Sequence, residues 1–342
     1  MQGGSQAVEV RVRRQPFKPR DRAEGLTGLL ELRAVAESFI FIGTGINRLV
    51  YRGTTIQEIA SSLDVRGEMF SSIRSECGRV AQLVVPGSSV KGAIRARIEL
   101  SFTGENGTSA SCFIRASPPI SPPTPGRHGW RHFAIWDPAP REDRGRPCDI
   151  SRARDVRAAQ VCVVCDIFGT AGLGSRVFFS DFVLTGGEVA DMALDHGERL
   201  EVVKPGATFE GEVGFTALDP EELGLLAFGM RLHDSGPILI GRSKYRPRIS
   251  PDGQRHIFGR VVFEPMRYKF AYYCEDVFEK LMKTAGLSDE DVRLNEIGDM
   301  LVEGEAARKL TSTVVEMAKR RYVPLGLRYG LDEVGRVEEL WK

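Results

Sequence analysis

Cysteine is scarce in this sequence, and long apolar runs are missing. Six cysteines in 342 residues are too few for a disulfide-stapled secreted module. The longest apolar runs, such as Val161–Val164, fall far short of the roughly 18 residues that a membrane span needs. The N-terminus also lacks the charged-then-apolar pattern of a signal peptide. We therefore expect a cytoplasmic protein that has no membrane partner.

The common hydrolase motifs are also missing. The five histidines are scattered between His128 and His256, and the sequence contains neither HExxH nor GxSxG. Asp64 is the candidate catalytic residue, because it could form a metal-assisted acid pair with Glu68. Acids four residues apart are more often simply solvated. A divalent ion such as Mg²⁺ would be required only if the chain cleaves its ligand.

Charge is balanced in total but uneven along the chain. The sequence holds 47 basic and 46 acidic residues. Residues 8–22 contain six basic and two acidic residues, and residues 242–269 contain eight basic and two acidic residues. Residues 275–305 instead contain ten acidic and three basic residues. Such blocks favour a protein that binds a polyanion on one surface, or that docks its acidic part on a basic neighbour. A salt-bridged, solvated surface is the alternative.

The apolar pattern predicts an α+β fold. Alternating and β-branched residues predict strands at 29–42, 81–85, 176–185, 208–216 and 237–240. Helical spacing predicts helices within 54–79 and at 90–100, 220–232, 271–283 and 306–322. Because helical crossovers of equal size are few, we expect a mainly antiparallel sheet.

Composition suggests three parts of the chain. Residues 1–25 form a basic N-terminal arm, 26–270 a core with an insertion at about 103–160, and 271–342 an acidic, helical C-terminal extension. The insertion is rich in proline and glycine, as in Ser117–Gly126, and we expect a long loop rather than a packed element.

One turn is typical of phosphate binding. Pro86-Gly87-Ser88-Ser89 leads into a predicted helix that Ser88 or Ser89 would cap, and Lys91 and Arg95 project from one side of that helix. The spacing is not that of a nucleotide-binding P-loop. An ordinary capped helix with solvated basic residues is the alternative.

Three glycine turns elsewhere in the sequence also favour phosphate binding. Glycine lets backbone approach a ligand closely, and a nearby cation can then hold a phosphate. The turns contain Gly43 and Gly45, then Gly169–Gly174 followed by Arg176, and Gly241 followed by Arg242 and Lys244. Together with the basic helix start they predict a groove that follows a polyanion.

Three cysteines have the spacing of a structural zinc site. Cys162 and Cys165 form a CxxC pair, and Cys148 precedes it by a short connection. Tetrahedral zinc needs a fourth nitrogen or sulfur ligand, for which we favour His132, with His128 and Cys112 as alternatives. Buried, metal-free cysteines are the other interpretation.

The motifs and their order resemble a known family. Residues 42–45 (IGTG), 85–95 (VPGSSVKGAIR), 162–169 (CVVCDIFG) and 175–181 (SRVFFSD) are similar to the RAMP superfamily of type III CRISPR effector complexes, above all to its backbone subunits. The resemblance covers about residues 26–185. It implies a ferredoxin-like (RRM-like) core with a thumb-like insertion, packed head to tail along a guide RNA. It also implies zinc on Cys162 and Cys165, and RNA contact by the basic helix start and the glycine turns.

We therefore expect a guide RNA-binding subunit that scaffolds the guide and its complementary target beside other subunits of a CRISPR complex. The expected RNA contacts are Gly43, Gly45, Ser88, Ser89, Lys91, Arg95, Arg176, Arg242 and Lys244. Alternatives are a subunit that cleaves target RNA with Asp64, a standalone CRISPR RNA-processing endoribonuclease, and a zinc-bearing interaction protein without an RNA role. In cleaving relatives the acid lies in a short glycine-rich loop, whereas Asp64 lies in a longer, partly helical interval.

Overall fold

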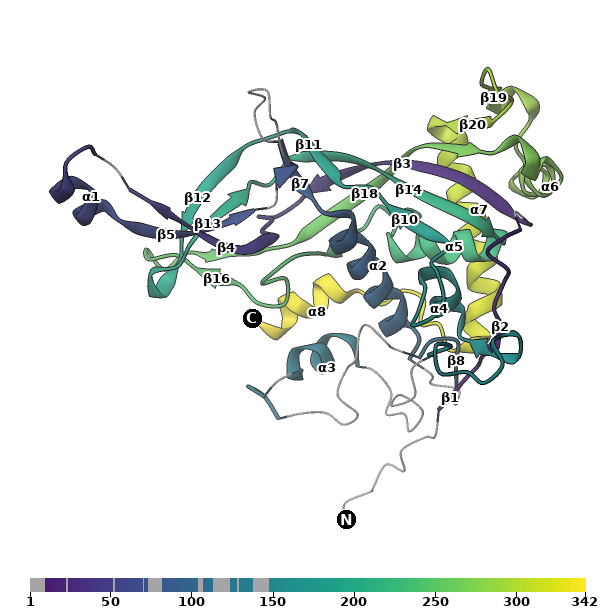
Figure 1. Cartoon of the computed structure of the whole chain (residues 1–342), viewed down its shortest axis with the longest axis horizontal. Coiled ribbons are helices and arrows are strands. Elements are labelled where there is room, and N and C mark those ends of the chain that lie inside the picture. The colour runs from purple at the N-terminus through teal and green to yellow at the C-terminus, as the bar shows by residue number, and fades with distance from the viewer. Residues whose placement is uncertain are drawn as a thin grey trace, which may run out of the picture.

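The computed structural model is an α+β protein built on one large antiparallel sheet (Figure 1). This confirms the predicted fold class. The structure describes residues 10–22, 24–51, 53–69, 71–72, 82–103, 107–112, 124–127, 129–137 and 148–342. Within these ranges, none of the helices combines the length and the apolar character that crossing a membrane requires.

The main sheet has the order β19-β20-β18-β3-β14-β11-β7-β6. β3 lies at its centre, and β14 and β18 both run antiparallel to it. The strands are β3 (Leu26–Ala36), β6 (Ser71–Ser72), β7 (Gln82–Val85), β11 (Phe182–Gly186), β14 (Thr208–Leu218), β18 (Arg260–Phe270), β19 (Val292–Leu294) and β20 (Met300–Glu303). Two short strands pair at its sides, β10 (Val177–Phe179) with β14 and β15 (Ile238–Leu239) with β18.

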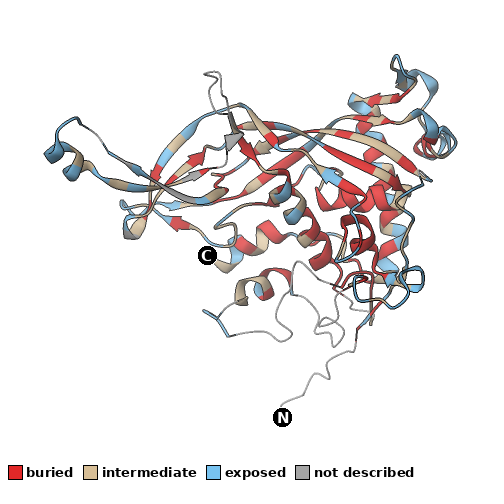
Figure 2. Ribbon diagram, viewed as in Figure 1, coloured by how far each residue is buried: buried red, intermediate tan, exposed pale blue. Residues whose placement is uncertain are grey.

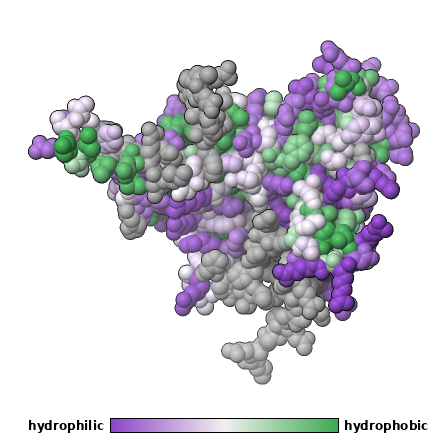
Figure 3. All heavy atoms as spheres, viewed as in Figure 1, coloured by the Kyte–Doolittle hydropathy of each residue, from purple (hydrophilic) through white to green (hydrophobic). Residues whose placement is uncertain are grey.

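A second, four-stranded sheet extends from the main one. Its order is β12 (Val189–Ala193), β13 (Arg199–Val203), β5 (Asp64–Met69) and β4 (Gly43–Val50). Helix α1 (Ile56–Ser62) sits at the tip of the β4–β5 arm, which projects to the left in Figure 1. Apolar side chains such as Leu49 and Ile56 are exposed on this arm. Figure 3 shows green, hydrophobic atoms at the surface of the projecting arm.

Three helices cover one face of the main sheet and form the core with it. They are α2 (Gly87–Ser101), α5 (Pro220–Gly229) and α7 (Gly304–Tyr322). Figure 2 shows the buried layer between these helices and the strands. Gly224 allows α5 to lie close to α7, because a Cβ there would be 1.8 Å from the carbonyl oxygen of Val314.

The other helices and strands are short and lie around this core. The helices are α3 (Trp130–Trp136), α4 (Val163–Phe168), α6 (Glu275–Ala285) and α8 (Glu333–Leu340). The strand pairs are β1 (Arg11–Val12) with β8 (Thr108–Ser109), β2 (Gln15–Pro16) with β9 (Gln160–Val161), and β16 (Arg248–Ile249) with β17 (Arg255–His256).

Several predicted elements have different ends in the structure. The strand predicted at 29–42 ends at Ala36, and Gly43 begins β4 instead of a turn. The helix after Pro86 begins at Gly87, so neither Ser88 nor Ser89 caps it. The backbone N–H of Gly87 donates instead to the carboxylate of Asp181, at 2.9 Å. A Cβ at Gly87 would lie 2.2 Å from the carbonyl oxygen of Phe179, so only glycine fits this helix start.

The predicted parts of the chain are more intermixed than their composition suggests. In the region 103–160, β8 pairs with β1 of the N-terminal arm, and Ala110 and Ile150 belong to the main hydrophobic core. These described segments are packed, unlike the loop expected there. The C-terminal part contains the predicted helices but also adds β19 and β20 to the main sheet.

A buried ion network fixes the N-terminal arm to the core. The guanidinium of Arg176 contacts the carboxylates of Asp166 and Glu222, each at 2.8 Å. Lys18 and Arg20 of the arm contact the same two acids. Although burial acts to raise the pKa of Glu222, hydrogen bonding and charge from Arg176 and the charge of Lys18 lower it to about 2.

This network predicts a loss of stability in acid. Since the pKa of Glu222 falls from 4.5 to about 2 on folding, its contribution is complete above about pH 4.5 and disappears as the pH falls toward 2. The difference corresponds to about 3 kcal/mol. We expect Glu222→Gln to lower the free energy of unfolding at pH 7. Between pH 5 and 3, the free energy of unfolding measured by urea titration should fall less in this variant than in the unaltered protein. Identical pH profiles would contradict the role of Glu222.

Candidate metal centre and polyanion groove

Four buried cysteines converge at one point of the fold. The Sγ atoms of Cys112, Cys148, Cys162 and Cys165 all lie within 4.8 Å of one another, and these cysteines form no disulfide. Four sulfurs around a tetrahedral zinc are about 3.8 Å apart, as Zn–S bonds of about 2.3 Å require. The cluster is therefore large enough, and compact enough, to hold a metal ion such as Zn²⁺.

Local structure holds these sulfurs in place. Cys162 caps the N-terminus of α4, and its Sγ accepts the backbone N–H of Cys165 at 3.4 Å. The backbone N–H of Cys162 in turn donates to Sγ of Cys148, at 3.2 Å. Cys112 follows β8, and its Sγ lies 3.5 Å from that of Cys165. Backbone N–H groups aimed at sulfur stabilise thiolates, which are the form that binds metal.

The four thiols shift one another's pKa in different directions: burial raises the pKa of the Cys162 thiol, and hydrogen bonds from Cys112 and Cys148 raise that of Cys165. Hydrogen bonds from Cys112, Cys162 and Cys165 lower the pKa of the Cys148 thiol. Arg95 of α2 donates from Nη2 to Sγ of Cys165 at 3.3 Å. A guanidinium beside the sulfurs offsets part of the negative charge that four thiolates would bring.

The fourth cluster member is Cys112 rather than His132. The ring of His132 lies against Tyr245, with Nε2 at 3.3 Å from the phenol oxygen, and is not part of the cysteine group. His128 lies outside the described residues. The CxxC pair and Cys148 were visible from spacing. Cys112, which was one of the alternatives for the fourth ligand, is 36 residues before Cys148, and it is singled out only once β8 packs on the core.

Two of the predicted RNA-binding arginines are buried. Arg95 is 5% exposed and donates to Glu99 and the carbonyl oxygen of Gly169 as well as to Cys165. Arg176 is 3% exposed and belongs to the ion network described above. Neither guanidinium faces solvent, because each is fully engaged inside the protein. A cation in a glycine-rich motif is therefore not by itself a surface cation.

Lys91 connects two of the predicted motifs. Its Nζ donates to the hydroxyl of Ser175 and to the carbonyl oxygen of Val177, each at 2.8 Å. This side chain attaches α2 to the segment that follows the 169–174 glycine turn. Ser88, one turn earlier in α2, is exposed.

The remaining motifs meet around an open groove. Gly43, Gly45, Ser89, Gly241 and Arg242 all line a hollow of about 690 Å³. These residues come from three distant parts of the sequence. Two of the three glycine segments and Ser89 of the helix start thus lie side by side, whereas the 169–174 turn and the basic side chains of the helix start are not in this lining. Arg242 is exposed, with a side chain that is 62% accessible and lies 3.5 Å from Glu198.

Backbone contacts hold the two glycine segments together. The N–H of Arg242 donates to the carbonyl oxygen of Phe41 at 3.0 Å. Gly241 has a φ of +81°, and a Cβ there would be 2.7 Å from the same carbonyl oxygen. Glycine is therefore required where the 241–242 turn crosses the chain just before Gly43.

Asp64 lies near the groove and is paired. Its carboxylate contacts Arg199 at 3.2 Å, and Arg199 lines the groove together with Val65. The side chain of Glu68, the possible acidic partner, lies outside the described side chains. Lys244 lines a neighbouring hollow, where burial lowers its pKa to about 8.

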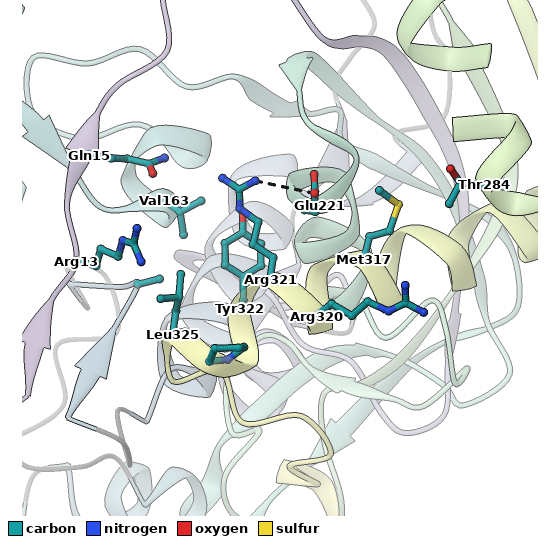
Figure 4. Close-up of a pocket in the computed structure, with 12 residues that line it drawn as sticks. Arg13, Gln15, Val163, Glu221, Thr284, Met317, Arg320, Arg321, Tyr322 and Leu325 are labelled. Carbon is teal, nitrogen blue, oxygen red and sulfur yellow. Dashed lines mark ion pairs between the residues drawn. The ribbon is translucent and has the colours of Figure 1, made fainter. Parts of the chain in front are cut away.

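A separate hollow of about 700 Å³ contains none of the predicted site residues. Arg13 of the N-terminal arm and Arg320 and Arg321 of α7 surround it (Figure 4). Arg321 is 3.9 Å from Glu221 across this hollow.

The cysteine cluster leads to a direct prediction. We expect about one zinc per chain, and Cys112→Ser should release it and lower the melting temperature by several degrees, because a structural zinc contributes directly to folding. Metal analysis and thermal unfolding measure both effects. Cys274→Ser, a buried cysteine outside the cluster, is the control, and His132→Ala should keep the metal. Zinc retained by Cys112→Ser would rule out the four-cysteine site.

Comparison with known proteins identifies the family. No curated protein matches the chain. Among solved structures, the crystal structure of Thermofilum pendens Csc2 is similar at 13% identity, covers 92% of this chain and 90% of that chain, and has a TM-score of 0.36. The family model of the RAMP superfamily matches residues 82–296. Because this match spans more than half of the sequence, the chain belongs to the RAMP superfamily.

Proposed function

We propose that this protein is a guide RNA-binding subunit of a type III CRISPR effector complex. The observation that carries the proposal is the groove, in which Gly43, Gly45, Ser89, Gly241 and Arg242 meet in a chain of the RAMP superfamily. The guide, its complementary target and neighbouring subunits are the proposed partners, in the cytoplasm. Processing of CRISPR RNA by the isolated chain is not favoured by any described contact.

The arrangement of the main sheet supports a ferredoxin-like core. The four strands β18, β3, β14 and β11 lie side by side in that order, and each runs antiparallel to its neighbour. Helix α2 lies between β3 and β11 in the chain, and α5 between β14 and β18. This is the β-α-β-β-α-β connectivity of the ferredoxin-like motif.

The groove suits a phosphate backbone better than base recognition. Glycines in its lining leave room for backbone to approach the ligand. Arg242 and Arg199 also line it, and each is paired with an acid: Arg242 lies 3.5 Å from Glu198 and Arg199 lies 3.2 Å from Asp64. Contacts of this kind position an RNA but carry little sequence information.

The cysteine cluster has a supporting role in this proposal. We place Zn²⁺ on Cys112, Cys148, Cys162 and Cys165, where it would hold α4 and the segment after β8 together. Arg95 connects this cluster to α2, whose first turn carries Ser89 into the groove. Loss of the metal should therefore disturb the groove indirectly.

The groove predicts salt-dependent RNA binding. We expect the protein to bind single-stranded RNA of unrelated sequences with similar affinity, with a logarithm of the binding constant that falls linearly with the logarithm of salt concentration. Arg242→Ala should reduce that slope by about 0.7, the value for one phosphate contact on a single strand. Filter binding at several salt concentrations measures it. Arg293→Ala, which removes an exposed arginine of β19 outside the groove, serves as the control. If Arg242→Ala leaves the salt slope unchanged, the groove is not part of the RNA-binding surface.

Cleavage of target RNA by Asp64 is a second candidate. The specific observation in its favour is that Asp64 contacts Arg199, a residue of the groove. Incubation of the guide-loaded complex with complementary RNA and Mg²⁺ tests it. If the Asp64 carboxylate binds the metal, Asp64→Asn should slow the periodic cleavage of target RNA at least about 100-fold. Its RNA affinity should stay within about twofold of that of the unaltered protein. Equal cleavage by both proteins, or none by the unaltered one, would leave scaffolding as the function.

A further inference from the structure

A smaller hollow adjoins the groove. It has a volume of about 410 Å³ and lies between α3 and the loop that follows β15. Gly241 and Arg242 line both hollows. A chain molecule that lies in the groove would therefore reach the smaller hollow without leaving the surface. Its size falls within the range of small-molecule sites, and a single nucleotide fits it.

Positive charge and aromatic rings dominate the lining of this hollow. Its described lining residues include five cations and no acid; the cations are Arg127, Arg131, Arg242, Lys244 and Arg246. Three rings lie among them, those of Trp130, His132 and Tyr245. This combination is typical of sites for unpaired nucleotides, where a base stacks on a ring while cations hold the phosphate.

Hydrogen bonds and packing hold Tyr245 in place. The indole N–H of Trp136 donates to the hydroxyl of Tyr245 at 3.2 Å, and that of Trp341 donates to the Tyr245 carbonyl oxygen at 2.9 Å. Tyr245 and Trp341 also pack against a second hydrophobic cluster, formed by Leu100, Ile135, Trp136, Leu239, Leu331, Val334 and Val337. A preformed site loses little freedom when a ligand binds.

Arg131 has one nitrogen, the buried Nε, without a hydrogen-bond partner among the described residues. Its guanidinium lies over the rings of Trp130 and Trp341, at 5.0 and 5.4 Å from their centres. Burial and the charge of Arg246 lower the pKa of Arg131. A bound phosphate would offset this repulsion and provide the missing acceptor.

We propose that this hollow binds one unpaired nucleotide of the RNA, with the base against Trp130 and Tyr245 and the phosphate toward Arg131 and Arg246. The inference rests on the proposed function and deepens it. It adds base stacking to a site that otherwise contacts only the backbone, and it makes single-stranded rather than double-stranded RNA the preferred ligand at this point.

The positions of the tryptophans give a direct readout. The chain has three, and all lie around this hollow: Trp130 lines it, and Trp136 and Trp341 both donate to Tyr245. Intrinsic fluorescence of the full-length protein therefore reports on this site. We expect a 12-nucleotide single-stranded RNA to quench the fluorescence. An abasic ribose-phosphate oligomer of equal length should leave it unchanged and bind at least about fivefold more weakly, as the loss of stacking requires.

Variants separate stacking from phosphate contact. Trp130→Ala should weaken RNA binding at least about fivefold with an unchanged salt slope, because stacking releases no counterions. Trp130→Phe should restore most of the affinity. Arg131→Gln, which keeps a polar side chain of similar length, should reduce both affinity and slope. Arg293→Ala again serves as the control, and near-ultraviolet circular dichroism checks that each variant is folded.

The outcomes distinguish this inference from the function on which it rests. If the unaltered protein binds no RNA, the proposed function and the nucleotide site both fail. If it binds RNA in an Arg242-dependent manner but binds the abasic oligomer equally well, the nucleotide site alone is overturned. If Trp130→Ala and Arg131→Gln leave the RNA affinity unchanged, the nucleotide site alone is likewise overturned.

Discussion

Buried Arg95 links the parts of this protein on which its proposed site depends. Its guanidinium donates to Glu99 within α2, to the carbonyl oxygen of Gly169 after α4, and to the sulfur of Cys165. A buried guanidinium left without these acceptors would be strongly destabilising, so α2, α4 and the cysteine cluster must pack together. The first turn of α2 contributes Ser89 to the groove. The metal centre and the groove are therefore connected through one side chain.

The groove itself depends on long-range backbone pairing. β3 holds β14 on one side and β18 on the other, and the segment that leaves β3 passes beneath the turn at Gly241. Neither glycine segment forms the groove alone, since one begins β4 and the other is a turn after β15. The hydrogen bond between Arg242 and Phe41 holds them at one surface, and glycine at 241 permits that approach. The shape of the groove therefore depends on the register of the main sheet rather than on a local motif.

The sequence predicted the fold class, most helices and the CxxC metal motif, because hydrophobic periodicity and ligand spacing are local properties. It could not predict which cations are buried. Arg95 and Arg242 both stand in glycine-containing motifs, yet one is enclosed by acceptors and the other is exposed. Local pattern could name Cys112 only as one of three alternatives for the fourth ligand, and it did not indicate the cap on Gly87 from Asp181, since both involve residues far away in the chain.

The net charge of +1 does not describe the local electric fields of this protein, because acids and bases are placed unevenly in the fold. Glu99, Asp166, Glu222 and Glu333 are all buried, and each pairs with a buried arginine. Such pairs cancel inside the protein and contribute little to the field outside it. The hollow beside the groove is lined instead by five cations and no acid, although one of these cations, Arg242, lies 3.5 Å from Glu198 of the neighbouring groove. Attraction for a polyanion therefore arises from where the acids are placed, and total charge is a poor guide to it.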